Sequence, residues 1–298
     1  MPKIIIASVF VIFLIFIGCS DENGEVSKQT VFSKLDVPLA TQGSYAFGIN
    51  NHGTIVGRYD DTNGTYGYTT TDKSTNFESI NCPGATKTVV TDINDNGHIV
   101  GVYTDISGLK YAFYSTDNGK SCGEINCFEA SKGTTAVSIN NNNQIVGYYK
   151  NDSGYYGFLS TDGGKSCETI TCKQFNFNTM AYGINDKGYI VGHTFDKLGQ
   201  YGFISLDGGL TCQKFSCPQV TGSTSAFGIN NNDIIVGTYG DSNVTFGYKK
   251  EYDSNECSAL GSYGEGNVTA YAINDSDTIV GVLRNESGVK QAILSEYK

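Results

Sequence analysis

The chain has 298 residues, a formal net charge of −10 and an apolar content of 39%. This length suits one hydrophobic core near the upper size of a single domain, and the acidic balance argues against nucleic acid as a partner, since like charges repel. Glycine and tyrosine are abundant (37 and 20) whereas proline is scarce (4), which is typical of twisted strands joined by tight turns.

The first segment has the pattern of an export signal. Residues 4–17 form an apolar run that is too short to span a bilayer as a helix but has the length of a signal-peptide core. The run ends in Phe-Ile-Gly-Cys, which resembles the bacterial lipobox, with Phe16 at the position where Leu is usual. The resemblance implies that Cys19 becomes a lipidated N-terminus. We therefore expect a lipoprotein signal peptide over 1–18 and a lipidated tether over 19–30; an ordinary secretory signal or an uncleaved anchor is the alternative.

Six copies of one unit follow, spaced 44 to 46 residues apart. Each copy has an Ile-Asn phrase, a turn, an Ile-Val-Gly triplet and then an aromatic-small-aromatic step, which is degenerate in the sixth copy. The pattern predicts four strands per copy, which in the third copy lie at about 135–140, 144–150, 155–160 and 168–175. Four strands in a unit of this size are typical of one propeller blade.

The two ends of the chain complement one another. Residues 32–38 align with 77–83, the fourth strand of the first copy, whereas the last copy stops after three strands. We therefore predict an all-β fold: a six-bladed β-propeller over 31–298, closed by an N-terminal strand that completes the last blade. A β-solenoid or a sandwich array is the alternative, although a solenoid would need capping repeats.

Two family resemblances rest on short motifs. The pattern Ile-Asn-(Asn/Asp)-x-Gly-x-Ile-Val-Gly recurs over residues 44–285 and resembles the HAF extracellular repeat family, which implies export but no particular activity. Segments 115–121, 160–166 and 205–211 are similar to the Asp-box of sialidase-like propellers. An Asp-box is a hairpin turn locked by an Asp that accepts backbone N–H bonds, so this resemblance implies a fold and not catalysis.

Eight cysteines follow Cys19, an even number in a chain expected to be exported. Three copies hold a Cys-x4-Cys pair, the first copy keeps only the second cysteine and the fifth keeps only the first. Pairing within a copy would leave two cysteines over, and residues five apart in a straight strand lie about 16 Å apart. We therefore predict four interblade disulfides between cysteines 40 residues apart, with zinc binding as the alternative. The pairs are Cys82–Cys122, Cys127–Cys167, Cys172–Cys212 and Cys217–Cys257.

The chain offers no recognisable catalytic set. Three histidines, His52, His98 and His193, fall at non-equivalent positions of different copies, so we expect them to be packed or solvated. Sialidases grip a carboxylate with three arginines, and this chain contains only Arg58 and Arg284. We therefore predict no catalytic residue.

Clustered oxygen ligands occur at 60–64 and 92–97, but neither cluster has the downstream bidentate Glu of a calcium loop. We therefore expect ordinary turns, with no metal and no cofactor. The asparagine that ends the first strand of each copy is the most regular polar feature, and we expect its amide to cap the following turn. The alternative is a ring of amides at the channel mouth that binds a polar ligand, formed by Asn50, Asn94, Asn140, Asn185, Asn230 and Asn274.

These patterns together predict a non-enzymatic lipoprotein that acts as a binding or adhesion module at the bacterial cell envelope, on the outer membrane or the cell surface. Its expected partners are the membrane, through the N-terminal lipid, and a glycan or surface protein; nucleic acid is not expected. A purely structural envelope component is the first alternative. A degenerate glycosidase or lyase on a sialidase-like propeller is the second.

Overall fold

The computed structural model describes residues 30–297 apart from eight short gaps, namely 72–75, 128–131, 174, 176–177, 219–221, 241–244, 262–266 and 285–287. The predicted signal peptide and Cys19 lie outside the described residues. Within the described part of the chain every regular element is a β-strand. None of its segments is a helix of the length and apolarity that crossing a membrane requires.

The strands follow the predicted order, four to a repeat, with the fourth strand of the last repeat supplied by β1. Their bounds are β1 (Thr30–Lys34), β2 (Gly43–Ile49), β3 (Ile55–Asp60), β4 (Thr65–Thr70), β5 (Glu78–Ile80), β6 (Lys87–Ile93), β7 (Ile99–Thr104), β8 (Lys110–Ser115), β9 (Gly123–Ile125), β10 (Thr134–Ile139), β11 (Ile145–Asn151), β12 (Gly154–Ser160), β13 (Glu168–Thr169), β14 (Thr179–Ile184), β15 (Ile190–Asp196), β16 (Gly199–Ser205), β17 (Gln213–Phe215), β18 (Ser223–Ile229), β19 (Ile234–Gly240), β20 (Thr245–Glu251), β21 (Ser258–Ala259), β22 (Asn267–Ile273), β23 (Ile279–Arg284) and β24 (Lys290–Tyr297).

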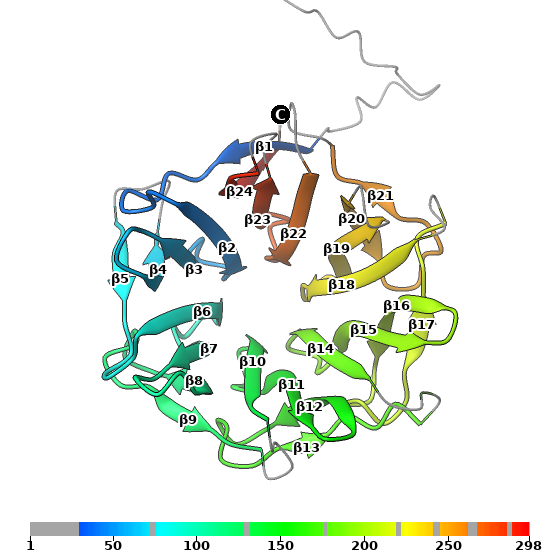
Figure 1. The fold of residues 1–298 in the computed structure, drawn as a ribbon. Helices are drawn as coiled ribbons and strands as arrows, with labels where there is room; N and C mark the ends of the chain where they lie inside the picture. The colour runs from blue at the N-terminus through cyan, green and yellow to red at the C-terminus, as the bar shows by residue number, and fades with distance from the viewer. Residues whose placement is uncertain are drawn as a thin grey trace, which may run out of the picture.

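The sheets are arranged in a ring (Figure 1). Four sheets have four strands each, in the orders β10-β11-β12-β13, β14-β15-β16-β17, β18-β19-β20-β21 and β1-β24-β23-β22. Strands β2 to β9 form one eight-stranded sheet, whose two halves are joined by a single parallel residue pair, Thr65 with Lys87. The first strand of each repeat lies innermost in the ring, and residues of these strands line a central channel. The strands are β2, β6, β10, β14, β18 and β22.

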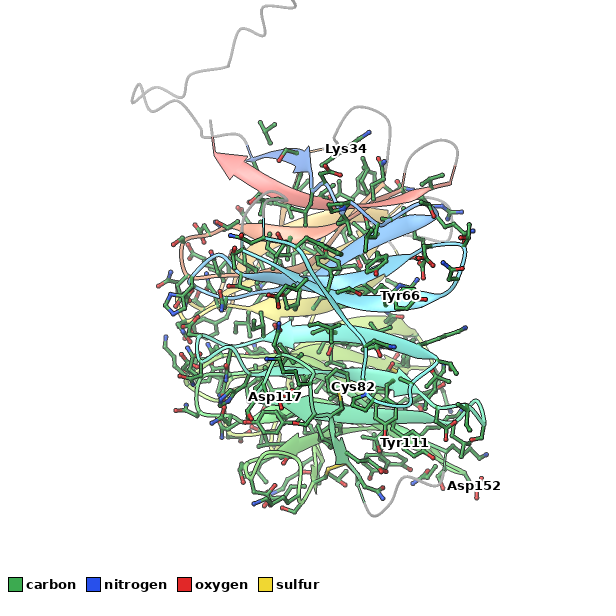
Figure 2. The ribbon with its side chains drawn as sticks, turned by 90° about the vertical axis from the view of Figure 1, so that its left-hand side faces the viewer. Lys34, Tyr66, Cys82, Tyr111, Asp117 and Asp152 are labelled. Atoms are coloured by element: carbon green, nitrogen blue, oxygen red, sulfur yellow. A yellow bond between two sulfur atoms is a disulfide. The ribbon has the colours of Figure 1, made fainter. Side chains whose placement is uncertain are left out.

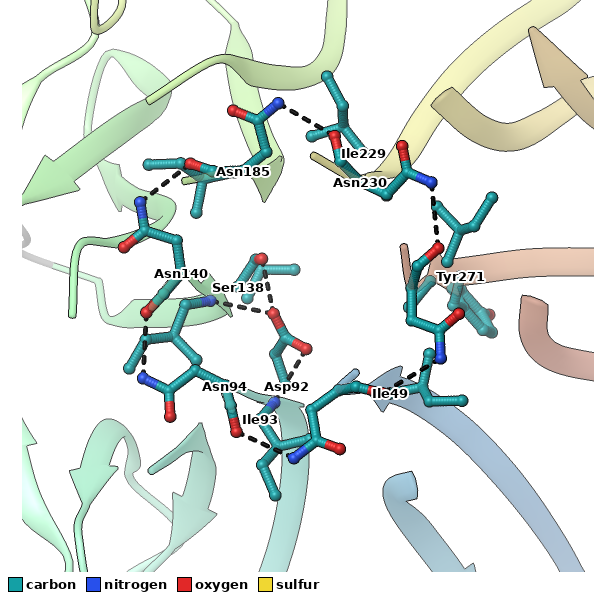
Figure 3. A pocket seen from close by; sticks show the side chains of 18 of the residues that line it. Ile49, Asp92, Ile93, Asn94, Ser138, Asn140, Asn185, Ile229, Asn230 and Tyr271 are labelled. Atoms are coloured by element: carbon teal, nitrogen blue, oxygen red, sulfur yellow. Dashed lines mark hydrogen bonds between the residues drawn. The ribbon is translucent and has the colours of Figure 1, made fainter. Parts of the chain in front are cut away.

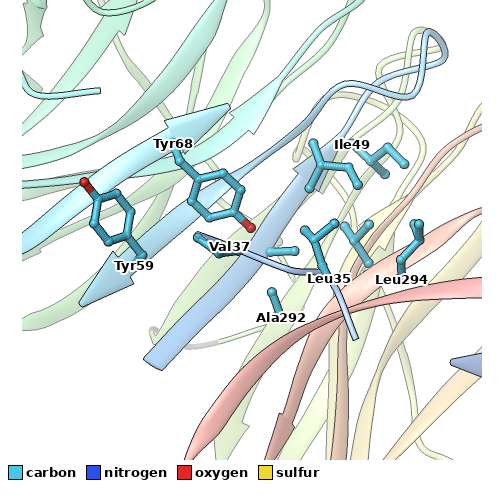
Figure 4. Packing of buried hydrophobic residues seen from close by; sticks show 10 residues of the cluster. Leu35, Val37, Ile49, Tyr59, Tyr68, Ala292 and Leu294 are labelled. Carbon is cyan, nitrogen blue, oxygen red and sulfur yellow. The ribbon is translucent and has the colours of Figure 1, made fainter. Parts of the chain in front are cut away.

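The N-terminal strand closes the ring. β1 pairs antiparallel with β24, in a register that runs from Thr30 opposite Tyr297 to Lys34 opposite Ile293. Beyond β1, Leu35 and Val37 are buried against Tyr68 and other side chains from both ends of the chain (Figure 4). Each such apolar side chain contributes about 1.5–3 kcal/mol when fully buried, so the seam between the termini is a packed core.

The Ile-Val-Gly triplet is explained by close packing. A Cβ on Gly147 would overlap the carbonyl oxygen of Thr135 and lie 2.8 Å from the Phe158 ring. Phe158 is the second aromatic of the aromatic-small-aromatic step and is fully buried. The absence of a side chain on Gly147 therefore leaves room for the Phe158 ring beside the backbone of the first two strands. This is why the Ile-Val-Gly triplet and the aromatic-small-aromatic step recur together.

Four disulfides link consecutive outer strands. Each joins the segment after one outer strand to the segment before the next, with Cα atoms 5.0 to 5.8 Å apart and 40 residues between partners. Figure 2 looks at the rim of the ring, where Cys82 is labelled. The pairs are those that the spacing predicts: Cys82–Cys122, Cys127–Cys167, Cys172–Cys212 and Cys217–Cys257. At the seam of the two termini, Val37 and Phe77, also 40 residues apart, pack in one apolar cluster instead.

The outer strands are shorter than the sequence predicts. In the third repeat the fourth strand is expected to reach residue 175, but β13 ends at Thr169. The chain then leaves its own sheet, because the backbone N–H groups of Thr171 and Cys172 donate to the carbonyl oxygen of Gly209 in the next repeat. Interblade bridging therefore replaces strand pairing along this segment.

The Asp-box turns form the locked hairpins that their resemblance implies. Asp117 accepts bonds from the backbone N–H and the hydroxyl of Ser121, at 2.9 and 2.7 Å, and from the hydroxyl of Ser115 at 2.8 Å. These donors stabilise the charged carboxylate and lower the pKa of Asp117 to about 2. Asp162 and Asp207 make the same bonds, so the three turns are structural.

Candidate binding site in the central channel

The inner strands and the turns that follow them enclose a cavity of about 250 Å³. Three layers of residues line it: the asparagine directly after each inner strand, the residue after that asparagine, and the residue three positions before it. The first layer is identical in all six repeats and the second alternates regularly between Asn and Asp, whereas the third follows no regular order. We therefore assign a structural role to the two regular layers and look for a binding site in the third layer.

The first layer is an unbroken circle of hydrogen bonds (Figure 3). Each side-chain amide donates to the backbone carbonyl of the equivalent asparagine in the next repeat, at 2.9 to 3.2 Å. The last bond, from Asn274 to the carbonyl oxygen of Asn50, spans 224 residues and closes the circle. The members are Asn50, Asn94, Asn140, Asn185, Asn230 and Asn274.

The same amides also cap the turns, as the sequence predicts. In the fifth repeat, the Oδ1 atom of Asn230 accepts the backbone N–H groups of Asn232 and Ile234, at 3.1 and 2.9 Å. The other five repeats have the equivalent pair of bonds. These asparagines are only 3% to 7% exposed. Both atoms of each amide are thus engaged within the fold, and a ligand-binding role for this ring stays a prediction.

The second layer alternates Asn and Asp around the ring, a feature that the sequence analysis missed. Each Asn amide donates to the carboxylates on both sides, at 2.8 to 3.0 Å, so each carboxylate receives two such bonds. Six aspartates would repel one another, whereas the alternation gives each charged carboxylate amide donors from both of its neighbours. The members in ring order are Asn51, Asp95, Asn141, Asp186, Asn231 and Asp275.

Asp95 illustrates the charge state of this layer. Partial burial disfavours its ionised form, but N–H bonds from Asn51 and Asn141 outweigh that effect and lower the pKa of Asp95. The signal for this ring is present in the sequence, because the residue after the conserved-looking Ile-Asn phrase alternates strictly from copy to copy.

The third layer consists of β-bulges. Every inner strand shifts register by one residue at the same place, between Ala46 and Gly48 in β2 for example. A bulge inserts one extra residue and redirects its side chain. The six inserted residues all line the cavity and are all partly exposed to it: Phe47, Thr91, Val137, Tyr182, Phe227 and Tyr271.

Four of these bulge residues form a continuous aromatic wall. Phe47 contacts Tyr271 with ring centroids 5.0 Å apart, Tyr271 contacts Phe227 at 5.4 Å, and Phe227 contacts Tyr182 at 5.3 Å. The interplanar angles of 48° to 87° show that the rings are not stacked flat on one another. Burial raises the pKa of Tyr271 to about 12 and raises that of Tyr182 as well, so both hydroxyls stay protonated.

The opposite wall holds a carboxylate. In the second and third repeats the bulge residues are the smaller Thr91 and Val137, and Asp92 follows the first of them. Its carboxylate accepts the hydroxyl of Ser138 at 2.6 Å and the backbone N–H groups of Ile139 and Ile93, at 3.0 and 2.9 Å (Figure 3).

Asp92 has no acidic equivalent in the other repeats, where the same position is Gly48, Ser138, Gly183, Gly228 and Ala272. Burial raises the pKa of Asp92 to about 6, although the three hydrogen bonds act in the opposite direction. A Cβ on Gly48 would lie 2.6 Å from the Asp92 Oδ1 atom, so the neighbouring strand needs glycine there to leave room for the carboxylate. In the sequence, Asp92 stands out only as one of the clustered oxygen ligands at 92–97. A comparison of this position across the six copies distinguishes it, because the other five residues there are not acidic.

The three histidines do not come together in one site. His52 lies in a turn, and the Nδ1 atom of His98 is 2.8 Å from the Oδ1 atom of Asn143. His193 is buried, its ring 5.0 Å from that of Tyr182, and burial lowers its pKa to about 4. Across the described residues, no group of three or more His, Cys, Asp and Glu side chains is placed to hold a metal ion.

Arg58 and Arg284 do not build an anion site. The Arg58 guanidinium lies 4.2 Å above the Tyr45 ring and 3.5 Å from the Asp60 carboxylate, so a neighbouring acid already balances its charge. Arg284 ends β23, the second strand of the last repeat. The two arginines therefore provide no three-guanidinium grip on a carboxylate.

No family model and no curated protein sequence matches this chain. Solved structures do match. The Hadza microbial sialidase Hz136 has a TM-score of 0.56 at 11% identity, over 86% of this chain and 66% of that one. Trypanosoma rangeli sialidase has a TM-score of 0.52 at 14% identity, over 93% of this chain and 57% of that one. TolB from Acinetobacter baumannii has a TM-score of 0.54 at 10% identity, over 82% of this chain and 68% of that one.

These matches define the class of fold. The protein is a β-propeller, as its repeats predict. At identities of 10% to 14% the likeness concerns the fold alone. This chain spans less than two thirds of the length of both sialidases.

Proposed function

We propose that this chain is an exported, lipid-anchored propeller of six blades that binds a ligand in its central channel and does not catalyse a reaction. The six-blade count is supported by the single residue pair that joins the halves of the eight-stranded sheet, each half being one repeat. Four disulfides fit an oxidising compartment outside the cytoplasm. The lipobox-like motif at Cys19 and the HAF-like repeats support attachment at the bacterial cell envelope.

The observation that carries this proposal is the broken symmetry of the bulge layer. A purely structural channel would repeat its third layer as it repeats the first two. Instead, an aromatic wall faces a half-buried carboxylate, that of Asp92, across the cavity. A concave site with apolar lining and a few fixed polar groups is the usual form of a small-molecule site. A structural envelope component is therefore the weaker alternative.

Binding is favoured over catalysis by the composition of the same layer. Glycoside hydrolysis needs two carboxyl groups about 5 to 10 Å apart on either side of the scissile bond. Asp92 lies next to the bulge residue Thr91, whereas the other three carboxylates of the described lining, those of Asp95, Asp186 and Asp275, are held in the Asn/Asp ring. The proposed partners are a glycan or surface protein at the channel and the membrane at the lipid.

An array of glycans and envelope proteins, probed with the full chain in non-ionic detergent, tests the channel. We expect at least one ligand whose affinity falls tenfold or more in Phe227→Ala. The matched control is Phe246→Ala, since Phe246 is 40% exposed in β20 and does not line the cavity. An equal loss of affinity in both variants, or the absence of any ligand for the wild type, would overturn the binding proposal.

The lipid anchor needs a separate experiment. We expect mass spectrometry of the mature protein to find a diacylated Cys19 as its first residue. We also expect Cys19→Ala to move the protein from the membrane fraction to the soluble fraction. An unmodified Cys19 in a membrane-bound protein would overturn this part of the proposal.

A further inference from the structure

The chemistry of the channel points to one class of ligand, an inference that rests on the proposed binding function. We propose that the channel binds a small organic cation, a quaternary or protonated amine, between the aromatic wall and the Asp92 carboxylate. The aromatic wall is defined by Phe47, Tyr182, Phe227 and Tyr271.

The aromatic wall suits a cation because ring faces carry negative electrostatic potential. Its four rings come from four different repeats and are partly exposed to the cavity. Cationic groups are attracted to such faces by roughly 0.5 to 2 kcal/mol each, and cages of several rings bind quaternary ammonium ions. The protonated hydroxyls of Tyr182 and Tyr271 keep the wall neutral at physiological pH.

No cation of the protein occupies these faces in the described part of the chain. The neighbouring ring of Tyr45, which stacks on Phe47 at 5.4 Å, is already covered by Arg58 at 4.2 Å and Lys290 at 5.2 Å. No comparable contact reaches the four rings of the aromatic wall among the described residues. The fold thus places cations over the adjacent ring and leaves the channel faces to a ligand.

The charge of the cavity has the matching sign. Its lining contains no Lys, Arg or His among the described residues, whereas four carboxylates line it, those of Asp92, Asp95, Asp186 and Asp275. The last three bond to Asn amides within the ring, but Asp92 has only neutral donors, Ser138 and two backbone N–H groups. Its ionised form therefore lacks a counter-charge, which a bound cation would supply.

The volume favours a compact group. Typical small-molecule pockets enclose roughly 300 to 1,000 Å³. This cavity, at about 250 Å³, fits a compact head group such as trimethylammonium. A sulfated or phosphorylated ligand is disfavoured, because it would meet four carboxylates and no cation in the lining.

Isothermal titration of the full chain with choline and with its neutral isostere 3,3-dimethylbutanol tests the inference. We expect choline to bind the wild type at least tenfold more tightly than the isostere. Asp92→Asn should narrow that difference by weakening choline alone, and Phe227→Ala should weaken both ligands. Asp105→Asn is the matched control, since Asp105 lies in an exposed turn outside the cavity.

A pH titration of the unaltered wild type guards against misfolding of Asp92→Asn. The preference for choline should decline as the pH falls from 7.5 to 5, because Asp92 takes up a proton near pH 6. The other titratable groups of the lining are Asp95, Asp186 and Asp275 in the turns and Tyr148, Tyr182 and Tyr271 in the strands. Tyrosines with raised pKa values do not titrate in this range.

Each outcome of this experiment decides one question. Equal affinity for the two probes, or no binding of choline, overturns the cation inference. If the isostere binds and Phe227→Ala abolishes that binding, the proposed channel function survives without the cation. If Phe227→Ala changes neither the probes nor the array ligand, the channel function itself fails.

Discussion

Replacing Asn230 by Ala removes three hydrogen bonds at once, one from the asparagine circle and two that cap the following turn. The amide donates to the carbonyl oxygen of Asn274 at 3.0 Å, and its oxygen accepts the N–H groups of Asn232 and Ile234 at 3.1 and 2.9 Å. Asn230 is 3% exposed, so water cannot freely replace the lost partners. At about 1 kcal/mol net for each bond, and more for backbone groups left without a partner, the loss is about 3 to 5 kcal/mol.

Urea unfolding under non-reducing conditions measures this loss as a lower midpoint at unchanged slope. Asn232→Ala is the matched control in the same turn. Its exposed amide makes one bond, to the carbonyl oxygen of Asp275 at 3.0 Å, and its loss should cost about 0.5 to 1 kcal/mol. A loss below 1 kcal/mol for Asn230→Ala, or equal losses for the two variants, would refute the view that the circle holds the blades together.

Three further predictions concern the disulfides and the pH dependence of stability. The double variant Cys172→Ala/Cys212→Ala opens a 40-residue loop and should lower the unfolding free energy by about 4 kcal/mol in urea; an unchanged midpoint would contradict the entropic estimate. Hydrogen bonds lower the pKa of Asp162 from 3.8 to about 2, so its stabilisation is present above pH 4 and disappears as the pH falls to 2; the melting temperature of Asp162→Asn should vary less over this range than that of the wild type. Burial lowers the pKa of His193 from 6.5 to about 4, so protonation favours the unfolded chain and stability should decline from pH 6.5 to 4; an equally steep decline in His193→Gln would count against this assignment.

The fold could be predicted largely because it is periodic. Each copy repeats the same sequence signals for strands, turns and glycines, so a strand that is hard to assign in one copy can be assigned from the others. The complementary ends predicted the pairing of β1 with β24, and the unequal cysteine content of the copies predicted the four disulfides. The fourth strands were predicted too long, because β-propensity alone does not reveal that Cys172 bonds to the backbone of the next repeat.

The channel could be predicted only in part. The asparagine positions are visible in the sequence, but whether an amide is free or occupied depends on distances across repeats, such as that from Asn274 to Asn50. The bulge residues escaped prediction for a different reason. Strand alternation alone does not indicate that Phe47 or Tyr271 is an inserted residue directed at the channel. The raised pKa of Asp92 likewise arises from burial, which no local pattern encodes.

A crystal structure of the full chain with bound tetramethylammonium tests the central claim, that the asymmetric bulge layer is the binding site. We expect one ion in the channel, in contact with Tyr271 and Phe227 and on the same side of the asparagine circle as Asp92. An ion bound on the rim or at the Asp-box turns, with an empty channel, would contradict it.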